Sequence, residues 1–155
     1  MINLSTFNQR NGKVQHSLTN NWTWDKIDQF RVQQISKNPL YYRDLGSGGY
    51  TVGGVSDEPY VAEVLNFLQP LEPTFYPRAG LYVSKDATSK SFPLHTDPGQ
   101  HLWVWQVIGS TPWQVGDEYL TLNESEVLYI LPGVPHRTIP NAPRASITLS
   151  LEEFI

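Results

Sequence analysis

Four histidines occur in the chain, and two of them lie in a pattern that could hold a metal ion. His95 and Asp97 are two residues apart at the end of an expected strand, so their side chains project to the same face. His136 follows the sequence Leu-Pro-Gly-Val-Pro, a tight turn that leads into a new strand. Two imidazoles and one carboxylate on one side of an ion are the ligand set of many non-haem iron(II) sites, and they leave positions open for a co-substrate and dioxygen. We therefore predict that these three residues bind a divalent metal, expected to be Fe(II), and form the catalytic centre.

Each half of this pattern also has a plain structural interpretation. His95 could be a strand-end histidine hydrogen-bonded to Asp97, and His136 could be a surface residue of the turn. A His-x-Asp tripeptide is common by chance. The metal-site prediction therefore depends on its combination with the Pro-Gly-x-x-His turn inside a series of short strands.

Arg144 and Ser146 form a second pattern, shortly after His136. A guanidinium and a hydroxyl two residues apart on a strand share a face and can bind a carboxylate together. If this strand lies beside that of His136, joined through 140–143, the guanidinium points into the metal cavity. A dicarboxylate co-substrate could then chelate the metal with one end and meet Arg144 with the other. The alternative is a surface arginine near a hairpin.

The elements expected to position these residues are mostly short strands separated by turn residues. We predict strands over 79–84, 92–97, 101–108, 112–115, 118–122, 126–131, 135–140 and 144–151. Eight short strands in succession are typical of a jelly roll or cupin-like barrel. The segment 101–108 is apolar on both faces and is expected to be central. His101 and Trp105 within it are possible cavity-lining residues, although indoles at 103 and 105 on one face more often belong to a core.

Two helices are expected before the strands. Thr23 can cap a helix over 24–36, and Ser56 or Asp57 can cap a second one that ends at Pro70. Residues 1–22 are predicted to be an arm or a peripheral strand. The glycine-rich stretch 43–57 is predicted to be a flexible loop, because it lacks the Lys-Ser or Lys-Thr and the following helix of a phosphate-binding loop.

These elements together predict a mainly β protein. We predict one domain over 1–155, in which an arm and buttressing helices over about 1–74 support a double-stranded β-helix over about 75–155.

Composition excludes several classes of protein. The chain has 155 residues, of which 39% are hydrophobic and 17% charged, so it is globular rather than disordered. A net charge of −4 makes a nucleic-acid partner improbable on electrostatic grounds. The absence of cysteine excludes disulfides, zinc–thiolate sites and thiol nucleophiles. No signal peptide or membrane-length apolar run is present, so we expect a cytoplasmic protein without a membrane partner.

Residues 79–151 resemble the catalytic core of Fe(II)/2-oxoglutarate-dependent oxygenases, in particular the JmjC and cupin-like ribosomal-oxygenase type. Four segments carry the resemblance: 80–83 is similar to N-x-Y, 92–97 to P-H-x-D, 103–113 to F-x-x-Q-x-x-G…W, and 127–136 to L-Y-x-P-x-G-x-x-H. The resemblance implies that dioxygen and 2-oxoglutarate are consumed while a C–H bond of a protein side chain or small molecule is hydroxylated. It also implies iron on His95, Asp97 and His136, with Tyr82 in the co-substrate pocket.

One departure from this family pattern matters for the co-substrate. The lysine usual shortly after the residue corresponding to Gly109 is absent, and Ser110 and Thr111 stand there. We therefore assign the far carboxylate of 2-oxoglutarate to Arg144 and Ser146, in the manner of the prolyl-hydroxylase branch, with Thr111 as a minor candidate.

Two other hypotheses stay open. The chain could be a cupin-type metalloprotein that binds or acts on a small ligand without 2-oxoglutarate. It could also be a non-catalytic barrel used for binding or assembly.

Overall fold

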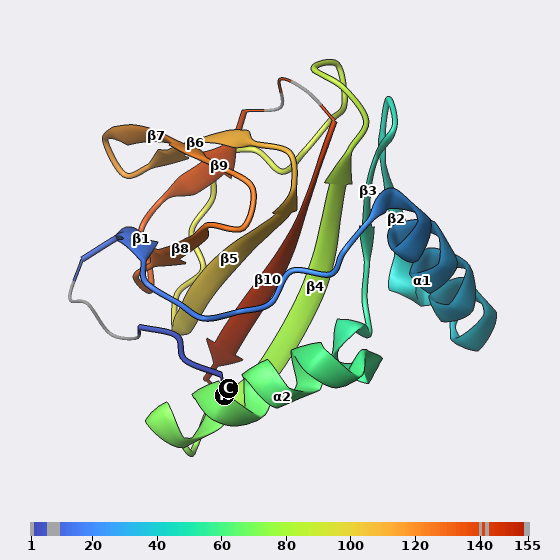
Figure 1. Cartoon of the computed structure of the whole chain (residues 1–155). Coiled ribbons are helices and arrows are strands. Elements are labelled where there is room, and N and C mark those ends of the chain that lie inside the picture. Colours follow the sequence, from blue (N-terminus) through green and yellow to red (C-terminus); the bar gives the residue numbers. More distant parts are fainter. Residues whose placement is uncertain (1, 6–9, 140, 142, 154–155) are drawn as a thin grey trace.

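Two antiparallel sheets face each other and enclose the interior of the molecule (Figure 1). The computed structural model describes residues 2–5, 10–139, 141 and 143–153. Within them, the larger sheet has the strand order β1-β8-β5-β10-β4-β3-β2, and the smaller sheet has the order β7-β6-β9. The strands are β1 Gly12–Val14, β2 Tyr42–Gly46, β3 Gly49–Val52, β4 Tyr76–Ser84, β5 Gln100–Ile108, β6 Thr111–Val115, β7 Glu118–Leu122, β8 Val127–Ile130, β9 His136–Thr138 and β10 Arg144–Glu152.

Two α-helices cover the outer face of the larger sheet, as expected. Helix α1 spans Trp24–Lys37 and lies beside β2, whereas α2 spans Pro59–Leu68 and crosses β4 and β10 (Figure 1). Short 3-10 helices occupy Pro39–Tyr41, Val55–Asp57 and Gln69–Leu71.

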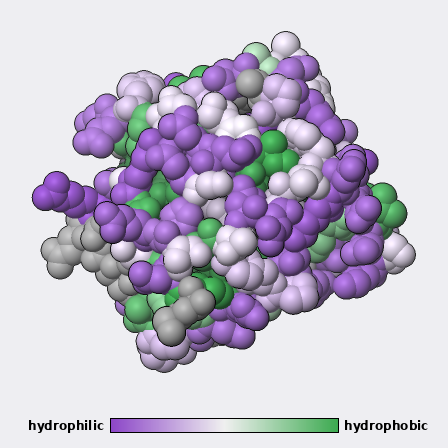
Figure 2. All heavy atoms as spheres, viewed as in Figure 1, coloured by the Kyte–Doolittle hydropathy of each residue, from purple (hydrophilic) through white to green (hydrophobic). Residues whose placement is uncertain are grey.

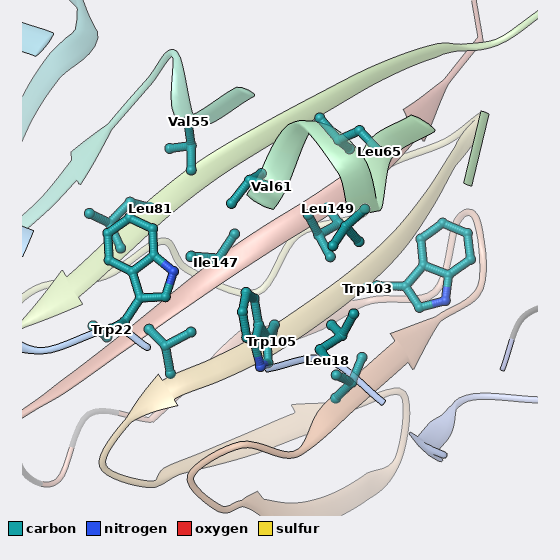
Figure 3. Packing of buried hydrophobic residues seen from close by; sticks show 14 of the residues in the cluster. Leu18, Trp22, Val55, Val61, Leu65, Leu81, Trp103, Trp105, Ile147 and Leu149 are labelled. Carbon is teal, nitrogen blue, oxygen red and sulfur yellow. The ribbon is translucent and has the colours of Figure 1, made fainter. Parts of the chain in front are cut away.

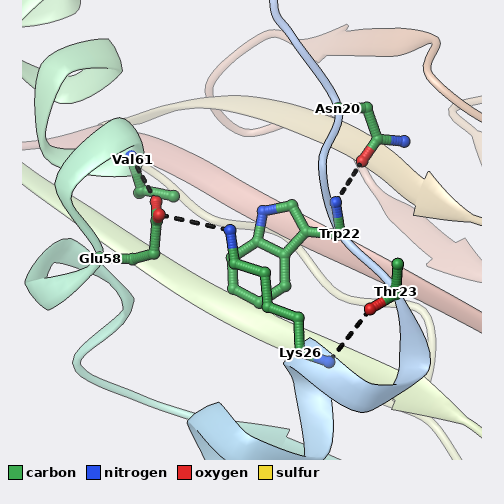
Figure 4. Close-up of polar contacts among 6 residues, drawn as sticks. All are labelled: Asn20, Trp22, Thr23, Lys26, Glu58 and Val61. Carbon is green, nitrogen blue, oxygen red and sulfur yellow. Dashed lines mark hydrogen bonds and ion pairs between the residues drawn. The ribbon is translucent and has the colours of Figure 1, made fainter.

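The residue before each α-helix caps it with a side chain that accepts from a backbone N–H of the first turn. The Thr23 hydroxyl accepts from the Lys26 N–H at 3.1 Å, which confirms the predicted cap of α1 (Figure 4). The expected cap of α2 by Ser56 or Asp57 is wrong, because both residues lie in the 3-10 turn that precedes the helix. The longer Glu58 caps α2 instead, accepting from the Val61 N–H at 2.8 Å and pairing with the Lys26 ammonium at 3.4 Å.

The main hydrophobic core lies between the larger sheet and the helices. Figure 3 shows Val61 and Leu65 of α2 packed near Ile147 and Leu149 of β10. All four are at most 3% exposed. Burying aliphatic side chains contributes about 1.5–3 kcal/mol each, so this layer anchors the sheet whose other face forms the cavity.

Strand β10 has one apolar and one polar face. Alternate residues from Ala145 to Leu151 belong to the core. The residues between them, from Arg144 to Glu152, face the other sheet and line the cavity. A polar face is tolerated inside the molecule because it lines a cavity rather than a packed core.

The sequence predictions for β5, β7 and β10 are confirmed closely, and the predicted fold class is confirmed by the two-sheet arrangement. Segment 101–108 lies between β8 and β10, as its apolar faces indicated. Pro140, at the end of the predicted strand 135–140, lies outside the described residues.

Two local predictions are wrong. Segment 92–97 is not a strand, and His95 alone forms an isolated bridge to His136. The glycine-rich stretch is not a loop throughout, because β2 and β3 form a hairpin there. Gly46 and Gly48 have φ values of 100° and 85°, so these glycines provide the turn between the strands rather than flexibility. In residues 1–22, the peripheral-strand alternative is borne out by β1, which pairs with β8.

The face of the molecule seen in Figure 1 is largely hydrophilic, with small separate hydrophobic patches (Figure 2). In the described part of the chain, every helix is too short or too polar to cross a bilayer.

Candidate metal centre and adjoining cavity

Strand pairing brings His95 and His136 together. Each residue donates its backbone N–H to the other's carbonyl, at 3.2 and 2.9 Å. Residues that exchange both hydrogen bonds in an antiparallel pair lie directly opposite each other, with their side chains on the same face. The two imidazole rings accordingly lie 4.5 Å apart between centroids.

Asp97 completes a three-residue cluster with these histidines. Its Oδ2 lies 3.1 Å from Nε2 of His136 and 3.6 Å from Nε2 of His95. One ligand atom from each residue lies within 4.8 Å of the others. His136 is buried, whereas His95 and Asp97 are partly exposed, so the cluster opens toward solvent on one side.

Backbone carbonyls orient both imidazoles for metal binding. Nδ1 of His95 lies 2.7 Å from the Pro93 carbonyl, and Nδ1 of His136 lies 2.9 Å from the Val134 carbonyl. A carbonyl only accepts, so each Nδ1 carries a proton, and each Nε2 is the nitrogen directed to a metal ligand position. Both Nε2 atoms converge on a carboxylate oxygen of Asp97, an arrangement that a bound metal cation, or a proton on Nε2, would stabilise.

The electrostatics of Asp97 agree with this role. A hydrogen bond from His136, when that imidazole is protonated, and the charge on both imidazoles lower the pKa of the Asp97 carboxyl despite its partial burial. The carboxylate is therefore ionised at neutral pH, as a ligand must be. Two imidazole nitrogens and one carboxylate suit Fe(II) and related divalent ions.

Arg144 lies buried in the same cavity, only 3% exposed. Its Nε donates to Ser84 Oγ at 3.1 Å, its Nη1 to Ser146 Oγ at 2.9 Å and its Nη2 to Thr138 Oγ1 at 3.5 Å. All three partners are neutral hydroxyls, and no carboxylate in the described residues lies within 4.0 Å of the guanidinium. Burial lowers the pKa of Arg144 to about 10, and it remains a cation at neutral pH.

Tyr82 and Ser146 lie beside the arginine as cavity-lining residues. Tyr82 pairs with Ser146 across β4 and β10, so their side chains share the inner face. Burial and the Asp97 charge raise the pKa of the Tyr82 hydroxyl, which therefore keeps its proton and can donate. Thr111 is fully buried and accepts from the Gln106 amide at 3.0 Å, so it lies behind the cavity wall and not on it.

His101 and Trp105 do not line the cavity, so that part of the sequence prediction is wrong. Side chains alternate along β5, and both residues point with Trp103 toward the helices. Leu102 and Val104 point the other way and contribute to the cavity wall. The expectation that the two indoles belong to a core is confirmed, since both are 0% exposed.

The cavity has a volume of about 730 Å³ and lies between the two sheets. This volume is within the range of about 300–1,000 Å³ for small-ligand sites. The metal cluster and Arg144 lie in its wall together with Thr138 and Arg43, which sequence reasoning missed. It also missed Ser84, a buried residue behind the wall that accepts from Arg144 Nε. Thr138 could have been predicted from the sequence as a cavity residue, because it lies two residues after His136 and so on the same strand face. Ser84 and Arg43 could be found only through strand pairing.

No family model matches the chain, and no curated protein sequence matches it. Solved structures do match. The ribosomal oxygenase YcfD from Escherichia coli, in complex with cobalt and succinic acid, superposes with a TM-score of 0.61 over 98% of this chain and 39% of that chain, at 17% identity. An RmlC-like cupin from Shewanella frigidimarina matches with a TM-score of 0.51 over 72% of this chain and 82% of that chain, at 11% identity.

The fold is that of the cupins. A third match has the same architecture: a mutant form of salicylate 1,2-dioxygenase from Pseudoaminobacter salicylatoxidans, with a TM-score of 0.53 over 83% of this chain and 34% of that chain, at 10% identity. The present chain spans about two fifths of the length of YcfD. At these identities the likeness concerns the fold, and the chemistry has to be argued from the site.

Proposed function

We propose that the chain is a cupin-fold oxygenase that uses Fe(II) and 2-oxoglutarate to hydroxylate a C–H bond of a protein side chain or small molecule. Two kinds of observation support this function: the His95–Asp97–His136 cluster, and structural neighbours that include dioxygenases. One of those neighbours, YcfD, has been crystallised with cobalt and 2-oxoglutarate.

The single observation that carries the proposal is the buried cation of Arg144, in the same cavity as the metal cluster and with hydroxyls as its partners. A buried charge without a counter-charge costs several kcal/mol. A carboxylate that enters the cavity would compensate this charge with a bidentate, charge-assisted contact. A diacid that reaches from the metal cluster to Arg144 can bind the metal with one carboxylate and the guanidinium with the other.

The chain's own residues have defined roles in this scheme. His95, Asp97 and His136 would hold the iron, which supplies the redox chemistry that couples decarboxylation of the diacid to oxidation of the substrate. Arg144 binds the distal carboxylate, with Ser84, Ser146 and Thr138 fixing the plane of the guanidinium. Tyr82 donates a hydrogen bond from its protonated hydroxyl to the co-substrate.

An anaerobic titration tests the proposal. Protein loaded with Fe(II) is titrated with 2-oxoglutarate while the visible charge-transfer band of the chelate is followed. We expect a saturable band in the native protein and in Arg10→Gln, whose arginine is exposed and outside the cavity. In Arg144→Gln we expect retained metal and at least about 10-fold weaker 2-oxoglutarate binding, because a charge-assisted bidentate contact is lost.

The outcomes separate the competing hypotheses. Metal binding with no chelate band contradicts the use of 2-oxoglutarate and leaves a cupin that acts on another ligand. Absence of metal uptake contradicts the metal centre itself and leaves a non-catalytic barrel. Equal 2-oxoglutarate affinity in Arg144→Gln would remove the role given to that residue.

A further inference from the structure

A row of polar side chains crosses the inner face of the larger sheet. Strand register places Arg43 opposite Thr51, Thr51 opposite Tyr82, and Tyr82 opposite Ser146. Directly opposed residues in adjacent antiparallel strands share a face. Arg43 therefore lies at the outer end of a row whose inner end is beside Arg144.

We propose that Arg43 binds an anionic group, a carboxylate or a phosphate, of the substrate that is oxidised. The inference deepens the proposed function and rests on it, because it names the substrate class of the same site. Strands are about 4.8 Å apart, so three steps place the Arg43 backbone roughly 14 Å from that of Ser146. This separation spans the wall of the cavity that also contains the metal cluster.

Phe92 connects Arg43 to the metal cluster. The Arg43 guanidinium lies 5.2 Å from the centroid of the Phe92 ring. The same ring lies 6.1 Å from that of His95 and 6.0 Å from that of Tyr82. A guanidinium held over an aromatic face keeps the N–H groups in its own plane free, so it is oriented before a ligand arrives.

Arg43 is exposed at the rim of the cavity, and among the described residues its guanidinium has no paired carboxylate. A divalent metal with Asp97, and Arg144, would together balance a doubly charged diacid. Arg78 pairs with Glu152 at 3.5 Å. In the described residues, Arg43 has no carboxylate within 4.0 Å, and its neighbour Asp44 is engaged at the hairpin turn, accepting from the Gly46 N–H at 2.8 Å. Arg43 is therefore a cation on the substrate side that can pair with an anionic group.

The remaining lining residues favour a small organic acid. Arg137 also borders the cavity, but its Nε donates to the Gln114 side-chain oxygen at 2.8 Å, so this donor is not available to a substrate. The outer part of the cavity also has aromatic and aliphatic walls, from Tyr41, Tyr76 and Leu45. A cationic residue beside apolar walls matches an apolar body that carries a negative group, and it disfavours a basic substrate.

Binding of a matched probe pair tests the inference. Protein saturated with Mn(II) and 2-oxoglutarate, so that Arg144 is occupied, is titrated with 3-phenylpropionate and with its neutral amide by calorimetry. We expect the acid to bind at least about 10-fold more tightly than the amide, a typical value for one charge-assisted contact. In Arg43→Gln this preference should fall to about 1-fold, in Arg43→Lys it should persist in part, and in Arg10→Gln it should be unchanged. Phenyl phosphate in place of the acid distinguishes a phosphate site from a carboxylate site.

Several results would overturn the inference. These are equal affinity for acid and amide, no binding of either probe, an acid preference that survives Arg43→Gln, or one that is lost in Arg78→Gln instead. Failure of the proposed function is a separate result: 2-oxoglutarate then does not bind, while an Arg43-dependent preference for the acid can still be measured on the Mn(II) protein. If 2-oxoglutarate binds and the preference is absent, only the substrate inference fails.

Discussion

The metal-ligand candidates owe their orientation to hydrogen bonds made two residues upstream. Pro93 and Val134 each offer a carbonyl to the histidine that follows two positions later, and this contact turns Nε2 toward Asp97. The ligand types and the His-x-Asp spacing were visible in the sequence. The tautomers were not, because they depend on backbone conformation at turns that local sequence does not specify.

Replacing Asp97 with alanine should remove most of the metal affinity. The change deletes the one anionic ligand and leaves two imidazoles. Loss of a residue that only hydrogen-bonds to a ligand costs about 10–100-fold in metal affinity. For loss of a ligand itself we expect Mn(II) binding to weaken by more than about 100-fold. Equilibrium dialysis with metal analysis measures the change. Asp117→Ala, at an exposed turn, is the matched control and should bind metal normally. Native affinity in the Asp97 variant would show that the metal lies elsewhere.

At the scale of elements, the turn between β5 and β6 packs closely against the start of β10, where Arg144 lies. Gly109 has a φ of 69°, and a Cβ there would lie 2.5 Å from the Pro143 carbonyl oxygen, next to the start of β10. Family-pattern reasoning identified this glycine, but only the structure shows that the close neighbour is the strand that carries the arginine.

Gly109→Ala should therefore destabilise the protein more than the same change at a turn where the added Cβ meets no close neighbour. We expect a loss of at least about 2 kcal/mol in the free energy of unfolding, because left-handed backbone strain adds to a backbone clash. Gly116→Ala is the control, since its φ is 59° but its nearest neighbour is the Val134 Cγ1 at 3.8 Å, so only about 1 kcal/mol of strain is expected. Urea denaturation compares the two, and equal losses would contradict the clash.

His101, on the outer face of β5, should make stability depend on pH. Burial lowers the pKa of His101, although Glu72 partly opposes the shift, and its Nδ1 lies 2.8 Å from the Tyr129 hydroxyl. Below the ordinary histidine pKa of about 6.5, the unfolded chain binds a proton that the folded chain does not, so stability falls as the pH falls through this value and levels off below the folded pKa.

The variant His101→Gln keeps a polar group for Tyr129 and removes the titration. Denaturation at about pH 7.5, 6 and 5 should give a flatter pH dependence than in the native protein. An unchanged slope would assign the dependence to other groups.

At the scale of the whole molecule, ligands that bind only the folded state should raise the melting temperature in separable steps. Each ligand at about 100 times its Kd adds about 2.7 kcal/mol, which corresponds to roughly 5–10 °C for a chain of this size. We expect Mn(II) to produce one step and 2-oxoglutarate a second step that requires the metal. Asp97→Ala should lose both steps, and Arg144→Gln only the second. A 2-oxoglutarate step in the absence of metal would contradict chelation.

The sequence by itself determined the mainly β architecture, the two helices, the ligand types and the arginine–serine pair, because each is expressed in local spacing. The tertiary structure alone decided that His95 lies opposite His136 without being in a strand, and that His101 and Trp105 face the helices. It also showed that a glycine-rich hairpin carries Arg43 to the cavity. Those features arise from pairing between segments that are far apart in the sequence. Register between such segments is set by packing of the whole sheet, and no local pattern specifies it.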